Sequence, residues 1–208
     1  GTLIGTAFLE MIPESLEHGP ENILLYVIIG IVLFYLLETV LYWYHCHHHS
    51  CHHPQEHAKS YTYLNLIGDG IHNFIDGAII AISFLTSTQL GVVTTLAVII
   101  HEIPQEIGDF AILVRGGFST NRALFFNFLS GLTAIIGALV GIGFVTAFQS
   151  VEPFLIAIGA GGFIYIATVD LLPELHNAPR SIISITQSVF FIFGVLIIYL
   201  IGLLPLAH

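Results

Sequence analysis

The sequence reads His72-Asn73-Phe74-Ile75-Asp76-Gly77 in one long apolar segment and His101-Glu102-Ile103-Pro104-Gln105-Glu106 in the next. An ionisable residue at the centre of a bilayer costs about 2.5–3.5 kcal/mol even on the insertion scale that gives the lowest values. Such residues therefore usually face a polar pathway or one another. The two stretches predict a polar site that is shared by two consecutive membrane spans.

The composition indicates a helical membrane protein. Of the 208 residues, 55% are hydrophobic and 9% are charged, whereas a water-soluble domain normally carries about 25% charged residues. The apolar runs last about 20 residues and do not alternate with polar residues, which is typical of spanning helices and not of membrane strands. We therefore expect an all-α, polytopic protein with the lipid bilayer as its surroundings.

Seven apolar segments are predicted to cross the membrane. A helix of about 20 residues, rising 1.5 Å per residue, covers the roughly 30 Å of a hydrocarbon core. Together the segments form one transmembrane domain over residues 1–208, with a His-rich loop at 45–60. The segments are 1–16, 22–44, 61–86, 90–115, 121–148, 154–175 and 181–206.

The basic residues predict the orientation of the spans. Lys59, Arg115, Arg122 and Arg180 all fall on connections that share one side of the membrane, and the positive-inside rule assigns that side to the cytoplasm. We therefore expect the His-rich loop in the cytosol and the C-terminus outside, in a plasma membrane or an inner membrane. Four bases against 14 acids give no support for nucleic-acid binding.

Helical spacing places the polar residues of the two stretches on shared faces, because residues four apart lie one turn apart. Imidazole and carboxylate ligands suit Zn²⁺ and other late first-row divalent ions such as Fe²⁺, Mn²⁺ and Co²⁺. Two alternatives stay open, namely buried hydrogen-bonding groups with a structural role and a proton relay without metal. The pairs with this spacing are His72/Asp76, His101/Gln105 and Glu102/Glu106.

The two stretches resemble the signatures of the ZIP (Zrt/Irt-like) family of divalent metal transporters. Residues 72–77 are similar to the family's His-Asn-x-x-Asp-Gly signature, and residues 101–106 to the His-Glu-x-Pro-His-Glu signature of its metalloprotease-like branch. Residues 7–14 and 169–174 match further family segments. The resemblance implies an eight-helix bundle in which the seven spans are helices two to eight, the first apparently missing. It also implies a homodimer that carries a divalent metal, most of all Zn²⁺, into the cytosol, with Fe²⁺, Mn²⁺, Co²⁺ or Cd²⁺ as other cargo.

The resemblance also assigns site residues, since the metal pathway of the family runs between the helices that correspond to 61–86 and 90–115 here. It implies a primary site at His72, Asp76, His101 and Gln105. It further implies that Asn73, Glu102 and Glu106 lie at or beside the second site of binuclear members.

This chain departs from the family pattern at several positions. Gln105 stands where the signature has its second His, so that a weaker amide ligand replaces an imidazole. Thr6 and Glu10 stand where related chains often have Asp and His, and only apolar residues surround Ala134, where some members have a Glu. The amide at residue 105 is expected to change the affinity for metal. Residues 6 and 10 bear on the outer entrance, and the apolar surroundings of Ala134 bear on whether the second site is complete.

Six further acids are candidates for an entrance or an exit path. Structural hydrogen bonding is the alternative for Glu38, Asp170 and Glu174, and solvated loop charge is the alternative for Glu14. The six candidates are Glu10, Glu14, Glu38, Asp109, Asp170 and Glu174.

The His-rich loop is a second candidate metal-binding region, because neutral imidazoles at this density bind transition metals. A tether with incidental affinity, or a disulfide between its two cysteines, is the alternative. The loop donors are His45, Cys46, His47, His48, His49, Cys51, His52, His53 and His57.

Three classes of function compete for this sequence. The first is a transporter of divalent metal ions, and the second is an intramembrane zinc hydrolase. A His-Glu-x-x-His helix would place two imidazoles one turn apart with Glu as the general base, but Gln105 breaks that template, and we expect no enzyme. The third class, a metal-responsive signalling protein that retains the site without flux, stays open.

Overall fold

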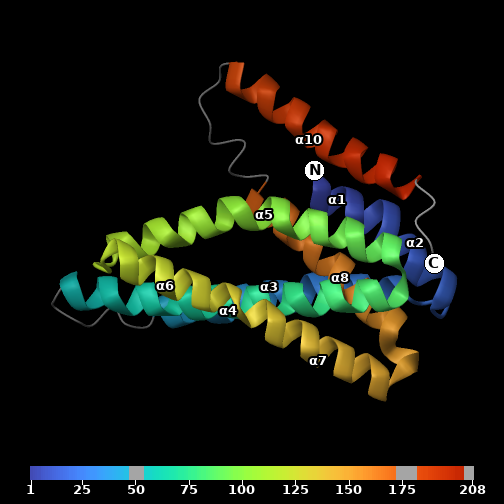
Figure 1. Ribbon diagram of the computed structural model, residues 1–208, viewed down its shortest axis with the longest axis horizontal. Coiled ribbons are helices and arrows are strands. Elements are labelled where there is room, and N and C mark those ends of the chain that lie inside the picture. Colours follow the sequence, from blue (N-terminus) through green and yellow to red (C-terminus); the bar gives the residue numbers. More distant parts are fainter. Residues whose placement is uncertain (47–53, 172–181, 204–208) are drawn as a thin grey trace.

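The computed structural model describes residues 1–46, 54–171 and 182–203, and within these ranges every regular element is helical (Figure 1). Three short π-helical or 3₁₀ segments, η1 (Ala7–Met11), η2 (Gln149–Val151) and η3 (Ile166–Leu171), interrupt or extend the α-helices. The α-helices are α1 (Thr2–Thr6), α2 (Ile12–His18), α3 (Leu24–Cys46), α4 (Pro54–Thr86), α5 (Thr88–Arg115), α6 (Thr120–Gly131), α7 (Thr133–Ala147), α8 (Glu152–Tyr165) and α10 (Ile182–Gly202).

Each of the seven predicted spans corresponds to one helical rod. The first rod runs through α1, η1 and α2, the fifth through α6 and α7, and the sixth through α8 and η3. Among the described residues, four rods are long and apolar enough to cross a membrane, at Thr88–Arg115, Thr120–Ala147, Glu152–Val169 and Ile185–Gly202. The prediction of an all-α, polytopic membrane protein is confirmed.

The predicted loop at 45–60 is shorter than expected. α3 continues through Cys46, and α4 already begins at Pro54. Proline is favoured in the first turn of a helix, where its missing N–H would have no partner. The residues that follow, such as Gln55, Glu56 and Ala58, are good helix formers. Residues 47–53 lie outside the described part of the chain.

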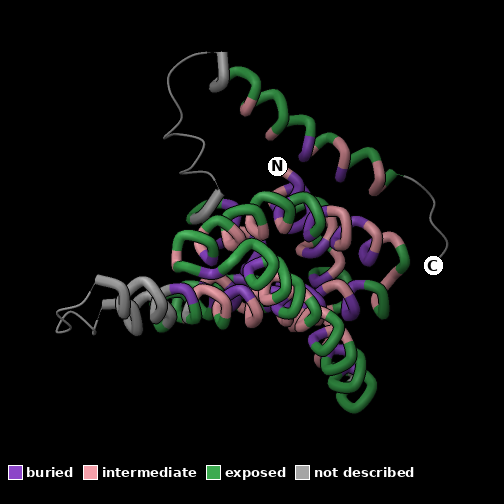
Figure 2. Tube along the Cα trace, turned by 60° about the vertical axis from the view of Figure 1, so that its left-hand side comes forward, coloured by how far each residue is buried: buried purple, intermediate pink, exposed green. Residues whose placement is uncertain are grey.

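The contacts between the helices define two groups, whose members overlap in the view of Figure 1. In the α4–α7 group, α4 lies along both α5 and α7, and α6 packs against α4 and α5. In the α8 group, α3 lies along α8, and the rod from α1 to α2 packs against α8 and α10. The two groups meet where α5 contacts α1 and where α4 contacts α8. The buried residues concentrate in the centre, whereas most of α10 is exposed (Figure 2).

Glycines bring the main helix pairs of both groups into backbone contact. A Cβ atom at Gly77 of α4 would overlap a carbonyl oxygen of α7, and one at Gly137 of α7 would overlap a carbonyl oxygen of α4. The same reciprocal arrangement joins α3 and α8 through Gly30 and Gly161. Because lipid provides no hydrophobic drive between helices, their association depends on such close packing. Each pair is therefore a tightly fitted unit.

Gly137→Ala is expected to destabilise the protein, because the added methyl group overlaps the backbone of α4 and forces the pair apart. Overpacking of this kind costs about 1–3 kcal/mol. Thermal unfolding of the purified protein in detergent would measure the loss. Gly143→Ala on the same helix is the control, since its added Cβ has no described atom within 4 Å apart from the adjacent backbone of its own helix. Equal melting temperatures for the two variants would contradict this role of Gly137.

Candidate metal site

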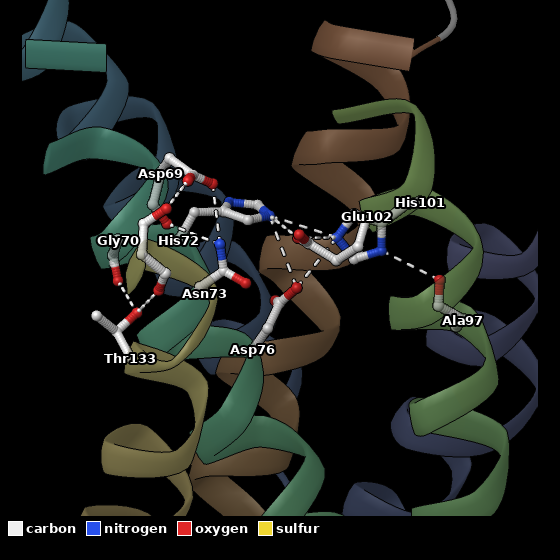
Figure 3. Close-up of polar contacts among 10 residues, drawn as sticks. Asp69, Gly70, His72, Asn73, Asp76, Ala97, His101, Glu102 and Thr133 are labelled. Carbon is white, nitrogen blue, oxygen red and sulfur yellow. Dashed lines mark hydrogen bonds and ion pairs between the residues drawn. The ribbon is translucent and has the colours of Figure 1, made fainter. Parts of the chain in front are cut away.

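The antiparallel hairpin of α4 and α5 brings the two polar stretches together. The helices meet at Ser87, whose side chain accepts a hydrogen bond from the Leu90 backbone N–H at 3.1 Å and so begins α5. His72 and Glu102 stand at equal distance along the chain from Ser87. Since both helices rise by about 1.5 Å per residue, the two residues lie at the same depth and face each other (Figure 3).

Two imidazoles and two carboxylates converge between α4 and α5 (Figure 3). Nε2 of His101 lies 3.1 Å from Oδ2 of Asp76, and Nε2 of His72 lies 3.3 Å from Oε1 of Glu102. The two Nε2 atoms are 3.3 Å apart. All four ligand atoms lie within 4.8 Å of one another. We call His72, Asp76, His101 and Glu102 the primary group.

The orientation of His101 is set by its own helix. Nδ1 of His101 lies 3.1 Å from the carbonyl oxygen of Ala97, one turn earlier on α5. A carbonyl oxygen can only accept, so Nδ1 carries the hydrogen of the neutral ring and Nε2 presents its lone pair to the primary group. Metal-binding histidines are commonly oriented by such a backbone contact.

The primary group contains more acceptors than donors. Both carboxylate oxygens of Asp76 and of Glu102 are buried, and within the described residues they have no hydrogen-bond partner. The side chains of Asp76 and His101 are each only 2% exposed. Because an uncompensated buried charge costs several kcal/mol, this arrangement favours a cation among its oxygens, such as a metal ion.

A second group of acids lies beside the first. Oxygens of Asp69, Glu102 and Glu106 lie within 4.8 Å of one another, so Glu102 belongs to both groups. We call Asp69, Glu102 and Glu106 the acidic group. Asp69 is buried, with 5% exposure, and the sequence analysis missed it. Its position one turn before His72 on the same helix is the signal that could have revealed it.

Hydrogen bonds from α6 and α4 hold the acidic group in place. The hydroxyl of Ser130 donates to Asp69, and the amide of Asn127 donates to Glu106. Asn73 donates from Nδ2 to Oδ1 of Asp69 at 2.9 Å (Figure 3). The family resemblance implies that Asn73 lies at or beside a second site. In the structure its amide nitrogen binds Asp69 of the acidic group, and its role as a ligand stays a prediction.

The structure thus brings five of the predicted ligands into the two groups and places Asn73 next to them. Gln105 is partly buried on α5, one turn after His101, and its role as a ligand stays a prediction. The five grouped ligands are His72, Asp76, His101, Glu102 and Glu106.

Asp109 and Glu38, both predicted for the exit path, differ in their surroundings. Asp109 continues the polar face of α5 beyond Glu106. It accepts a hydrogen bond at 2.8 Å from Asn65 of α4, and its other oxygen is buried without a hydrogen-bond partner among the described residues. Glu38 instead accepts from the Tyr165 hydroxyl and joins α3 to α8.

The candidate entrance residues lie near the α4–α5 turn. Glu10 lies in η1, where Oε2 is 3.4 Å from Nε2 of Gln89. Glu14 lies one turn later, and its Oε1 is 3.3 Å from Nδ1 of His18.

The remaining predicted residues cannot be placed as ligands. Asp170 belongs to η3, and His45, Cys46 and His57 belong to helices, but the side chains of these four residues are outside what the structure describes. Glu174, His47, His48, His49, Cys51, His52 and His53 lie outside the described residues altogether.

Comparison with known proteins identifies related chains. Residues 44–202 match the family model described as ZIP Zinc transporter. The chain is 33% identical over 258 residues to Zinc transporter zipt-7.1 of Caenorhabditis briggsae, covering 94% of this chain and 66% of the relative. It is 33% identical over 225 residues to Zinc transporter ZIP13 of Pongo abelii, covering 98% of this chain and 64% of the relative.

A third relative, Zinc transporter foi of Drosophila melanogaster, is 41% identical over 131 residues, which cover 63% of this chain and 18% of the relative. The chain therefore spans less than two thirds of the length of each of these relatives.

Loss of either His101 or Asp76 is expected to weaken zinc binding by more than about 100-fold, which is the upper limit for losing a residue that only orients a ligand. Equilibrium dialysis of purified His101→Ala and Asp76→Ala proteins against Zn²⁺ would measure the affinity. A background in which the imidazoles and thiols between residues 45 and 57 are replaced by serine removes competing sites. His18→Ala is the matched control, because this exposed imidazole lies outside both groups. An unchanged affinity in His101→Ala would refute the primary group as a zinc site.

Proposed function

The chain belongs to the ZIP zinc transporter family, and we propose that it carries Zn²⁺ across a membrane into the cytosol. The observation that supports this most directly is the primary group, in which two imidazoles and two carboxylates converge between two buried helix faces. Two nitrogen and two oxygen donors suit Zn²⁺, which favours four ligands of this kind. The names of the related zinc transporters agree with the proposal.

Glu102 provides a way for the ion to leave the primary group. Because its carboxylate belongs to both groups, an ion can exchange the imidazoles for Asp69 and Glu106 while it remains bound to Glu102. Asp109, one turn beyond Glu106 on the same helix, offers the next carboxylate. The proposed route therefore runs along α5 toward Arg115, at the end of the helix that we assign to the cytosol.

The orientation follows from the four bases on one side, and it places the His-rich loop in the cytosol and the C-terminus outside. In that position the loop imidazoles would receive ions that leave the acidic group. The family resemblance supports a homodimer in the lipid bilayer of a plasma or inner membrane. Fe²⁺, Mn²⁺, Co²⁺ and Cd²⁺ are the ions that we expect to compete with Zn²⁺ for the same donors.

Of the two other classes of function, the sequence disfavours the hydrolase, and the site geometry does not distinguish a transporter from a signalling protein. A zinc hydrolase with the His-Glu-x-x-His arrangement needs a second imidazole one turn after the first, and this position holds Gln105. A signalling protein would retain the metal site but show no flux. Measurement of flux therefore separates the proposal from both alternatives.

Zinc uptake is expected to disappear in the Asp76→Ala/His101→Ala double variant, because the primary group then loses two of its four donors. Purified protein in liposomes loaded with a zinc-sensitive dye would report uptake. The His18→Ala variant should take up zinc at the rate of the unmodified protein. Uptake that survives in the double variant would show that the ion follows another route, and hydrolysis of peptides without uptake would favour the enzyme.

Gln105→His is expected to lower the zinc concentration at half-maximal uptake and also to lower the maximal rate. An imidazole binds Zn²⁺ more strongly than an amide does, so the ion would enter at lower concentrations and leave more slowly. Initial rates over a range of zinc concentrations would separate the two effects, with Gln105→Leu as the control that removes the ligand. Identical kinetics in the His and Leu variants would show that residue 105 does not contact the ion.

A further inference from the structure

The turn between α4 and α5 is attached on both sides to the α8 group (Figure 1). Thr86, the last residue of α4, donates a hydrogen bond from its hydroxyl to Glu152, the first residue of α8. Gln89, near the start of α5, donates from Nε2 to the carbonyl oxygen of Gly202 at 2.9 Å, at the end of α10. The same Nε2 lies 3.4 Å from Oε2 of Glu10 in η1. The contacts thus join the hairpin to three elements of the other group.

Away from the turn, the polar contacts of α4 and α5 are made within the α4–α7 group. The side chains of Asp69 and Glu106 receive hydrogen bonds from α6, and Asp109 receives one from Asn65 of α4. These partners all belong to the α4–α7 group. The hydrogen bonds of Thr86 and Gln89 therefore connect the two groups at the α4–α5 turn, whereas those around the acidic group stay within one group.

An apolar layer lies between the turn and the primary group. Ile79 and Ile82 of α4 and Leu90 of α5 are buried together with Met11 of η1 and Ile156 of α8. The layer draws residues from both helix groups, so a hydrated ion can pass it only if the groups separate at this end. A cavity of about 330 Å³ lies on the side of the layer that faces the α4–α5 turn, and Thr86 and Glu152 line it.

We propose that Thr86–Glu152 and Gln89–Glu10/Gly202 form an outer lock, which closes the outer route and must open each time an ion enters. This inference rests on the proposed function, since it assumes that the ion comes from the side of the α4–α5 turn. The hydrogen bonds of the outer lock are of a kind that can break and form again repeatedly. The donors are neutral and the Thr86 pair borders the cavity, so water can replace each hydrogen bond at small net cost.

Crosslinking tests the outer lock directly. Thr86→Cys/Glu152→Cys is made in a background with Cys46→Ser and Cys51→Ser, and the protein in liposomes is treated with a short bifunctional methanethiosulfonate reagent. Zinc uptake is expected to fall at least tenfold after crosslinking and to return after reduction with dithiothreitol. Gly70→Cys/Thr133→Cys is the matched control, because this pair joins α4 to α7 within one group, and its crosslinked form should keep its uptake. Undiminished uptake by the crosslinked Thr86→Cys/Glu152→Cys protein would overturn the lock.

Thiol labelling provides a second test that does not require zinc flux. Met11→Cys places a reporter in the apolar layer, where residue 11 is fully buried, and a membrane-impermeant thiol reagent is added. Thr86→Val should raise the labelling rate about fivefold, the factor that a change of about 1 kcal/mol gives a two-state equilibrium. Thr95→Val removes a hydroxyl that donates to the Gly91 carbonyl oxygen within α5 and should not change the rate.

The two measurements separate the lock from the proposed function. If the unmodified protein takes up no zinc, the proposed function fails, while the labelling rates still report on the lock. Equal labelling of the Thr86→Val and Thr95→Val proteins would overturn the lock even where uptake is normal.

Discussion

The burial of four ionisable side chains between two apolar helices is the constraint on which the other features depend. His72, Asp76, His101 and Glu102 meet at distances of hydrogen-bond length, yet the carboxylate oxygens of the two acids lack hydrogen-bond partners in the described part of the chain. Such an arrangement is stabilised by a cation, because an uncompensated buried charge costs several kcal/mol. When a metal ion leaves, protons on the imidazoles can take its place. The primary group is therefore suited to the exchange of cations.

The glycine contacts determine which parts of the molecule can keep this geometry while others change. Gly77 and Gly137 hold α4 against α7, and Gly30 and Gly161 hold α3 against α8, so each pair resists separation. All four residues of the primary group lie on α4 and α5, within a single helix group. Because α4 and α5 also pack along each other, the ligand distances can stay constant while the boundary with the α8 group opens. The apolar layer and the outer lock lie at that boundary, away from the ligands.

Local spacing predicts the helices and the shared face of His72 and Asp76, whatever surrounds them. The family resemblance implies His101 and Gln105 as their partners on the next span, whereas the structure brings His101 and Glu102 to the primary group. Asp69 was missed although it lies on the same face, since the family signature begins three residues later. The contributions of Ser130 and Asn127 had no local signal. They depend on how α6 packs against α4 and α5, which residue spacing does not reveal. The loop at 45–60 was overestimated because its histidines masked the helix-forming residues after Pro54.

The two groups also differ in how strongly they would hold zinc, and this difference bears on the direction of release. The primary group offers two imidazole nitrogens, whereas the acidic group offers only carboxylate oxygens. Zinc binds both kinds of donor, but oxygen-only sites are those that harder ions such as Mg²⁺ and Ca²⁺ prefer. An ion that passes through Glu102 into the acidic group would therefore be bound less selectively and released more readily. Under the proposed transport, a selective site followed by a weaker one would let the protein discriminate among metals without retaining the ion that it has selected.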